Sequence, residues 1–209
     1  MVSEKVFIDA DELLLDSYRL AAQVIKADFE PSFMIAIWRG GAPIGIAVQE
    51  FLQYRGIESD HIAIRTSSYH GIDDQASQVQ VHGLNYLAKN VIHEDRLLIV
   101  DDVWDTGLTI EAVIKELRRR ARLNTPKEIR IAVPYFKPER NKTNLKPDFF
   151  VHEVDSWLKF PHSLEGLTIE EVQSHRPDLY EIVSGAIDSG ESSRNTDKNI
   201  PVSLPRTVV

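Results

Sequence analysis

A short acidic segment of this chain combines residue types that could bind a phosphorylated sugar. Asp101 and Asp102 follow the apolar run 97–100, and the sequence Asp-Thr-Gly-Leu-Thr occupies 105–109. Apolar spacing predicts a helix over 110–117, and the free N–H groups at a helix N-terminus bind anions, phosphate above all. Carboxylates beside a phosphate site make sense if they accept hydrogen bonds from sugar hydroxyls or hold Mg²⁺ against a pyrophosphate. The segment therefore predicts a sugar-phosphate site.

An alternative interpretation of the same segment is an acidic capping turn without a ligand. Asp and Thr are both good N-cap residues, so Asp105 or Thr106 could begin the helix. The full run of strand, acidic turn and amphipathic helix favours the ligand site.

The run 97–109 resembles the motif with which type I phosphoribosyltransferases bind phosphoribosyl pyrophosphate (PRPP). The resemblance implies that Asp101 and Asp102 bind the ribose hydroxyls directly or through Mg²⁺, as its ligands. Asp105 would lie near N7 of a purine and act as the acid–base group. The residues that would wrap the 5-phosphate are Thr106, Gly107, Leu108 and Thr109. Trp104 is bulkier than the residue usual at its position, and we expect it to pack beneath this loop.

A second loop, Trp38-Arg39-Gly40-Gly41, separates an apolar run from a predicted helix that begins at Pro43. On its own it reads as a glycine turn. In the family that the chain resembles, the equivalent loop binds pyrophosphate through backbone N–H groups and one basic side chain. The resemblance implies that Gly40 and Gly41 supply the backbone groups and Arg39 the side chain.

The polar stretch 66–83 has little periodicity and is interpreted as a long loop or loose hairpin. Ser68 and Tyr69 stand near its start. The resemblance implies a mobile loop here that closes over the active site, which would keep water from an oxocarbenium-like sugar. The alternative is a surface loop without a function.

Residues 134–165 resemble the base-binding region of the hypoxanthine and xanthine-guanine branch. The resemblance implies that Lys137 donates to the 6-oxo group of a purine, Trp157 stacks on the base and Leu158 reads its edge through the main chain. The alternatives are a solvated lysine and a core tryptophan. Relatives commonly place an acid beyond the stacking aromatic, which is missing here, so the second metal ligand and the preferred base stay open.

Predicted strands alternate with predicted helices along the chain, which favours βαβ units and a mainly parallel sheet. The predicted strands are 34–37, 61–64, 97–100, 129–133 and 149–151, and the helices are 11–26, 43–54 and 110–117. The expected fold class is α/β, a twisted sheet flanked by helices. The resemblance adds a mobile active-site loop and a small base-binding hood. We expect one domain over 1–183 and a flexible tail over 184–209.

Composition excludes several classes of function. The formal net charge is −8, whereas a nucleic-acid binder needs basic surface to displace counterions. The basic run 118–122 is interpreted as cations at a helix C-terminus. The absence of cysteine excludes zinc–thiolate and thiol chemistry and fits a cytoplasmic location. No apolar run approaches the ~20 residues needed to cross a bilayer. The histidines show no metal-ligand spacing and are interpreted as structural or surface residues.

Together the resemblances imply a purine phosphoribosyltransferase that uses Mg²⁺. It would convert a 6-oxopurine (hypoxanthine, guanine or xanthine) and PRPP to the nucleoside 5′-monophosphate and pyrophosphate, as in purine salvage. Relatives are dimers or tetramers, so a homo-oligomer is expected. The alternatives are a PRPP-binding regulator without catalysis and a phosphoribosyltransferase for a non-purine acceptor.

Overall fold

The computed structural model of the chain describes residues 5–69 and 78–188. These residues belong to two compact units, one that ends at Ser163 and one that begins at Leu164. The first unit carries every segment that the sequence marked as a candidate site.

The first unit alternates strands and helices, as predicted. Its strands are β1 (Lys5–Phe7), β2 (Phe33–Trp38), β3 (Asp60–Tyr69), β4 (Gln78–His82), β5 (Arg96–Val100), β6 (Val103–Trp104), β7 (Glu128–Phe136), β8 (Phe149–Glu153) and β9 (Trp157–Lys159). Its α-helices are α1 (Ala10–Lys26), α2 (Gly41–Tyr54), α3 (Asn85–Asn90) and α4 (Leu108–Ala121), and its 3₁₀ helices are η1 (Arg122–Asn124) and η2 (Pro138–Arg140).

The main sheet is mostly parallel and has the order β4-β3-β2-β5-β7. Strand β7 is long enough to pair with β5 over its first half and with β6 near its end, while β8 also pairs with it. Only the β3–β4 pair of this sheet is antiparallel. Strands β1 and β9 form a separate parallel pair. The predicted α/β class with a mainly parallel sheet is confirmed.

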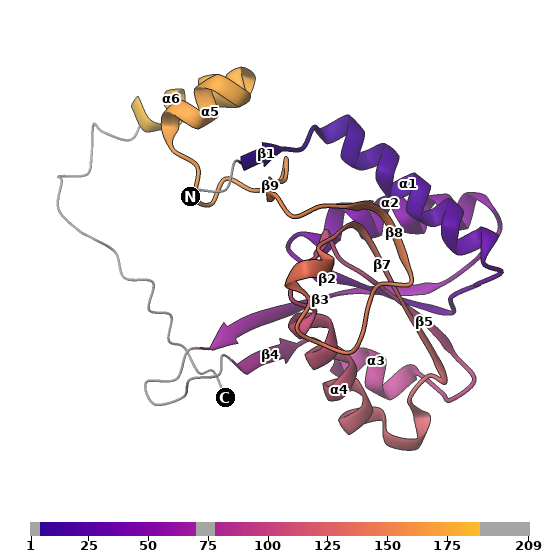
Figure 1. Cartoon of the computed structure of the whole chain (residues 1–209). Coiled ribbons are helices and arrows are strands. Elements are labelled where there is room, and N and C mark those ends of the chain that lie inside the picture. The colour runs from indigo at the N-terminus through magenta and orange to yellow at the C-terminus, as the bar shows by residue number, and fades with distance from the viewer. Residues whose placement is uncertain (1–4, 70–77, 189–209) are drawn as a thin grey trace. The chain divides into compact units, whose positions relative to one another are not determined.

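The sheet buries apolar side chains on both of its faces, as a parallel sheet covered by helices must. Figure 1 shows α1 and α2 on one face and α3 and α4 on the other. Successive residues of a strand point to opposite faces, and β5 illustrates this. Leu97 and Ile99 pack in the core with α3 and α4, whereas Leu98 and Val100 pack in the core with α1 and α2. The apolar run before the acidic turn is therefore fixed from both sides.

The polar stretch 66–83 differs from the loop interpretation at both ends. Strand β3 extends through Tyr69 and pairs with β4 as an antiparallel hairpin, in which Ser68 lies opposite Val79 and Tyr69 opposite Gln78. The hairpin interpretation was right for 66–69 and 78–82, and residues 70–77 lie outside the described residues.

The described part of the second unit, 164–188, contains two helices, α5 (Ile169–His175) and α6 (Pro177–Asp188). A capping box begins α5, because Thr168 Oγ1 accepts from Glu171 N and Glu171 Oε2 accepts from Thr168 N. The predicted domain boundary at residue 183 falls inside α6. The predicted tail beyond Asp188 lies outside the described residues.

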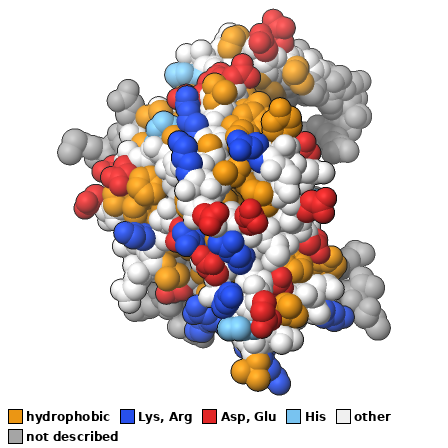
Figure 2. Space-filling view, turned by 90° about the vertical axis from the view of Figure 1, so that its right-hand side faces the viewer, with side chains coloured by type: hydrophobic (Ala, Val, Ile, Leu, Met, Phe, Trp, Pro, Cys, Tyr) orange, Lys and Arg blue, Asp and Glu red, His pale blue; other side chains and the backbone are white. Residues whose placement is uncertain are grey.

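Within residues 5–69 and 78–188, no helix has both the length and the apolar character needed to cross a membrane. On the face drawn in Figure 2, acidic and basic side chains are interspersed rather than gathered by sign.

Candidate active site

The acidic turn lies where β5 ends, at the carboxyl edge of the parallel sheet, where open α/β folds bind ligands. Asp101 and Asp102 separate β5 from the short strand β6, and the turn Asp105–Gly107 leads into α4. A cavity of about 210 Å³ is lined by residues 101–107, 109 and 110 alone. The predicted sugar-phosphate segment therefore forms a hollow of its own.

Gly107 is the N-cap of α4 and makes no side-chain capping hydrogen bond. Neither Asp105 nor Thr106 is the N-cap residue that the capping alternative proposed, although Thr106 Oγ1 accepts from Leu108 N at 3.5 Å. Gly107 has a φ of +78°, which favours glycine. A Cβ there would also lie 2.7 Å from the ring of Trp104. Because the N-cap residue Gly107 has no side chain to cap the helix, the backbone N–H groups of the first turn suit an anion.

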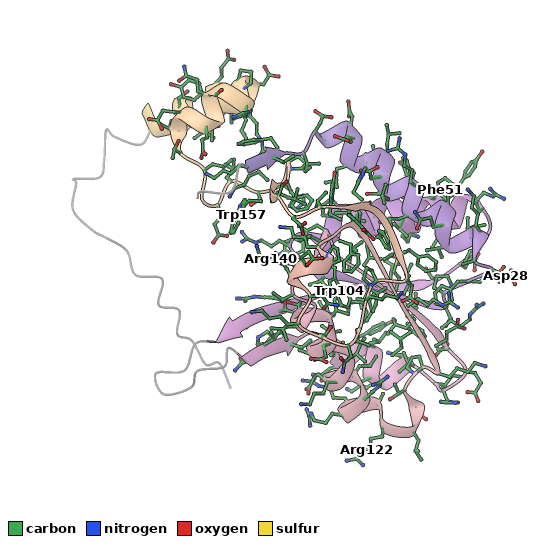
Figure 3. All side chains as sticks on the ribbon, viewed as in Figure 1. Asp28, Phe51, Trp104, Arg122, Arg140 and Trp157 are labelled. Atoms are coloured by element: carbon green, nitrogen blue, oxygen red, sulfur yellow. The ribbon has the colours of Figure 1, made fainter. Side chains whose placement is uncertain are left out.

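Trp104 forms the floor of this turn, as the sequence predicted. Its side chain is 1% exposed and belongs to the core shared with α3 and α4. The indole N–H donates to Asn141 Oδ1 at 3.2 Å, so the buried ring keeps its polar atom paired. Trp104 and Arg140 are labelled in Figure 3, at the end of the sheet.

The Arg39-Gly40-Gly41 loop packs directly against the acidic pair. A Cβ on Gly40 would overlap the carboxylate of Asp102, and one on Gly41 would lie 2.6 Å from the carbonyl oxygen of Val100. The Trp38–Arg39 peptide bond is cis, and the Arg39 side chain is exposed. The structure thus brings the predicted pyrophosphate loop and the predicted ribose acids together.

The two adjacent acids differ in their surroundings. Burial, and then the neighbouring charge of Asp102, raise the pKa of Asp101 well above its usual range, although hydrogen bonds from the backbone N–H groups of Asp102 and Gly41 oppose this. Asp102 Oδ2 lies 3.4 Å from Nε2 of His162, a contact that sequence reasoning missed. His162 stacks on Phe160 at 5.4 Å between ring centroids. The segment after β9 thereby reaches one of the predicted ribose acids.

Asp105 contacts Arg140, a basic residue that sequence reasoning missed. Arg140 Nε lies 2.6 Å from Asp105 Oδ1 as an ion pair, and this buried oxygen makes no hydrogen bond to the part of the chain that the structure describes. Lys137 stands nearby at the end of β7 and is 4% exposed, so it is not a solvated lysine. Burial lowers its pKa, an effect that the charges of Asp105 and Asp155 oppose and that of Arg140 reinforces.

The other base-site candidates lie on β9. Trp157 is 48% exposed, which rules out a core role, and Lys159 Nζ lies 5.8 Å from its ring centroid. Leu158 is half-buried and packs against the core with α1 and α2. Both belong to the strand that pairs with β1.

A buried polar network outside the acidic turn was also missed from the sequence. Asp16 of α1 is fully buried, and its two oxygens contact Arg19 at 2.6 Å and His152 at 2.7 Å. Ligand atoms of Glu12, Asp16 and His152 lie within 4.8 Å of one another. These residues link α1 to β8, and the structural interpretation of His152 stays a prediction.

The chain is similar to several known proteins. A hypoxanthine-guanine phosphoribosyltransferase of Bacillus subtilis is 27% identical over 153 residues, which cover 72% of this chain and 79% of the relative. A crystal structure of a purine phosphoribosyltransferase from Pyrococcus horikoshii superposes with a TM-score of 0.63 at 25% identity, over 78% of this chain and 97% of that one. A Neisseria gonorrhoeae protein crystallised with bound ppGpp has the same fold, with a TM-score of 0.66 at 20% identity over 89% and 98% of the two chains. The family model of the phosphoribosyl transferase domain matches residues 8–168, most of the chain, and the chain therefore belongs to the phosphoribosyltransferase family.

Proposed function

We propose that this protein transfers the phosphoribosyl group of PRPP to N9 of a 6-oxopurine. The proposal rests on the burial of Lys137, which directly follows β7 and whose charge interacts with that of Asp105. A buried ammonium needs a partner, and the 6-oxo oxygen of hypoxanthine, guanine or xanthine would be one. Similarity to hypoxanthine-guanine and purine phosphoribosyltransferases supports the same substrates.

The sugar side of the reaction falls to the acidic turn. Asp101 and Asp102 would accept hydrogen bonds from the ribose hydroxyls, and the segment Thr106–Thr109 would hold the 5-phosphate at the start of α4. The pyrophosphate would lie on Gly40 and Gly41, where the backbone is bare and a side chain would collide with the acids, with Arg39 beside it.

The same residues fit Mg²⁺. Their carboxylate oxygens are hard ligands of the kind that Mg²⁺ prefers, and the Gly40 backbone lies directly against Asp102, so a pyrophosphate on that backbone would lie beside the ion. Asp101 and Asp102 would hold the ion, which would neutralise the leaving pyrophosphate.

On the base side, Trp157 would stack on the purine and the Leu158 main chain would read its edge. N9 would attack ribose C1 as the bond from C1 to the pyrophosphate oxygen breaks. Asp105 would accept the proton that leaves N7. Positioning and charge stabilisation would supply most of the rate. We further propose that the segment after Ser68 and Tyr69 closes over the site. The protein would also form a homo-oligomer and have a cytoplasmic location.

The test is a panel of bases incubated with PRPP and Mg²⁺, with pyrophosphate release measured. We expect turnover with hypoxanthine, guanine or xanthine. Adenine should be a poor substrate by up to ~10⁴-fold, because its 6-amino group would leave the buried Lys137 donor unpaired. Equal turnover of adenine would refute the base site. Turnover of pyrimidines alone would identify another acceptor, and PRPP binding without turnover of any base would indicate a regulator.

A further inference from the structure

We infer that Arg140 is a positioning residue for Asp105, a role that rests on the proposed acid–base function of this aspartate. Arg140 Nε lies 2.6 Å from Asp105 Oδ1. Within residues 5–69 and 78–188 this buried oxygen makes no hydrogen bond, and the guanidinium is the cation that contacts it directly.

The loop that carries Arg140 is fastened to both neighbours of Asp105. Trp104 Nε1 donates to Asn141 Oδ1 at 3.2 Å, and Lys142 N donates to the carbonyl oxygen of Thr106 at 2.9 Å. The residues before and after Asp105 thus each bind the residues directly after Arg140. Because hydrogen bonds on both sides constrain its geometry, this ion pair differs from a pair of unconstrained surface charges.

The loop is itself rigidly held. Asn141 Nδ2 donates to the carbonyl oxygen of Leu145 at 2.7 Å, and both Thr143 N and Thr143 Oγ1 donate to Asn141 Oδ1 at 3.1 Å. Arg140 N also donates to the carbonyl oxygen of Lys137 at 3.2 Å. The position of Arg140 is therefore fixed on one side by its bond to Lys137, directly after β7. On the other side it is fixed by the bonds that the next two residues make with Trp104 and Thr106.

Arg140 would hold one carboxylate oxygen of Asp105 and so fix the orientation of the other toward the base. A planar guanidinium suits this task, since its donors are fixed in direction, whereas a lysine ammonium is a point charge on a flexible stem. Catalytic groups lose large factors in rate when they are displaced by about 1 Å. The effect should appear in the chemical step and leave PRPP binding largely intact.

The experiment is a double-mutant cycle on the full chain, with Arg140→Gln, Asp105→Asn and the double variant assayed with hypoxanthine, PRPP and Mg²⁺. We expect Arg140→Gln to lower kcat by about 10- to 100-fold, with the KM for PRPP changed by less than about 2-fold. In the Asp105→Asn background the same substitution should have no further effect, because Arg140 acts through that carboxylate. Arg140→Lys should recover part of the loss. Lys146→Gln, which removes an exposed positive charge from the same loop, serves as the matched control and should keep full kcat.

Each other outcome has a distinct meaning. Full kcat in Arg140→Gln, with a slow Asp105→Asn, overturns the positioning role and leaves the proposed function standing. Additive losses in the double variant also overturn it, since Arg140 would then act on the substrate directly. Full kcat in Asp105→Asn refutes the acid–base function itself, and the role of Arg140 with it. Thermal unfolding should shift by less than about 2 °C in Arg140→Gln, and a larger loss would indicate that Arg140 supports the fold instead.

Discussion

Gly40 lies against the carboxylate of Asp102 so closely that a Cβ at position 40 would overlap Oδ2. The two residues belong to loops that follow β2 and β5, which are neighbours in the sheet. The proposed pyrophosphate loop and the proposed ribose acids are therefore one surface, and neither can change shape alone.

We expect Gly40→Ala to impair PRPP binding more than folding. The new methyl group displaces either the Asp102 carboxylate or the backbone that would hold pyrophosphate, so PRPP affinity should fall at least about 10-fold. Overpacking typically lowers the free energy of unfolding by ~1–3 kcal/mol, and a side-chain carboxylate that can rotate away places this case at the lower end. Calorimetry with PRPP and Mg²⁺, beside thermal unfolding, checks both effects.

Gly185→Ala is the matched control for that substitution. Gly185 lies in α6, and among the described residues no atom beyond its chain neighbours and its own helix backbone comes within 4 Å of an added Cβ. Alanine there should be neutral or stabilising by up to ~1 kcal/mol. Wild-type PRPP affinity in Gly40→Ala would contradict the shared surface.

Local sequence predicted the acidic turn well because its structure is local. The strand Arg96–Val100, the turn and α4 form one continuous stretch, in which apolar spacing marks the elements and Gly107 marks the break. The residues of this stretch line one cavity, so knowing the stretch was enough to know the pocket.

Contacts between distant segments could not be predicted in this way. Arg140 meets Asp105 from 35 positions away, and His162 meets Asp102 from 60 positions away. No local pattern distinguishes these two side chains from the other arginines and histidines of the sequence. The end of β3 was missed for a related reason, since its polar residues form a strand by pairing with Val79 and Val81 of β4.

Asp101→Asn should stabilise the protein at neutral pH in the absence of divalent cations. Burial and the charge of Asp102 raise the pKa of Asp101 in the folded state. A folded pKa above the unfolded one means that stability is lost as pH rises through the folded value. Asparagine does not ionise, so the free energy of unfolding of the variant should be higher by on the order of 1 kcal/mol. This is the cost typical of a buried polar group that lacks a partner.

The pH dependence provides the check on that prediction. The gap in stability between Asp101→Asn and the wild type should close as the pH falls toward the ordinary Asp pKa of 3.8. PRPP affinity should fall in the same variant. A variant that is less stable at neutral pH would mean that the carboxylate supports the fold.

Lys137→Met should separate base recognition from sugar binding. Methionine keeps the length of the side chain and removes the buried ammonium, so folding should be unaffected or improved. Loss of a hydrogen bond from a charged donor should lower kcat/KM for hypoxanthine by about 10- to 100-fold, and discrimination against adenine should shrink. PRPP affinity should stay unchanged. Lys146→Met, at an exposed position, controls for the loss of charge, and unchanged use of hypoxanthine by Lys137→Met would contradict the role of Lys137.

Asp105→Asn tests the acid–base role most directly. Asparagine keeps the shape of the side chain and removes the proton acceptor, so kcat should fall by about 10² to 10⁴-fold, the usual contribution of such a group. The KM for PRPP should change little, because the sugar and phosphates are assigned to Asp101, Asp102 and the start of α4. Steady-state kinetics with hypoxanthine, beside thermal unfolding, measures both.

Stability separates this role from a structural one. Gly107 is the N-cap of α4, so Asp105 does not support the helix as a cap, and its ion pair with Arg140 is partly open to solvent. Pairs of this kind contribute about 0–1 kcal/mol, so the variant should unfold within a few degrees of the wild type. A slow enzyme with a normal fold then leaves the proton step as the cause. Full kcat would refute the acid–base role of Asp105. The proposed 5-phosphate site would be unaffected, because its backbone geometry depends on Gly107 and Trp104 rather than on this carboxylate.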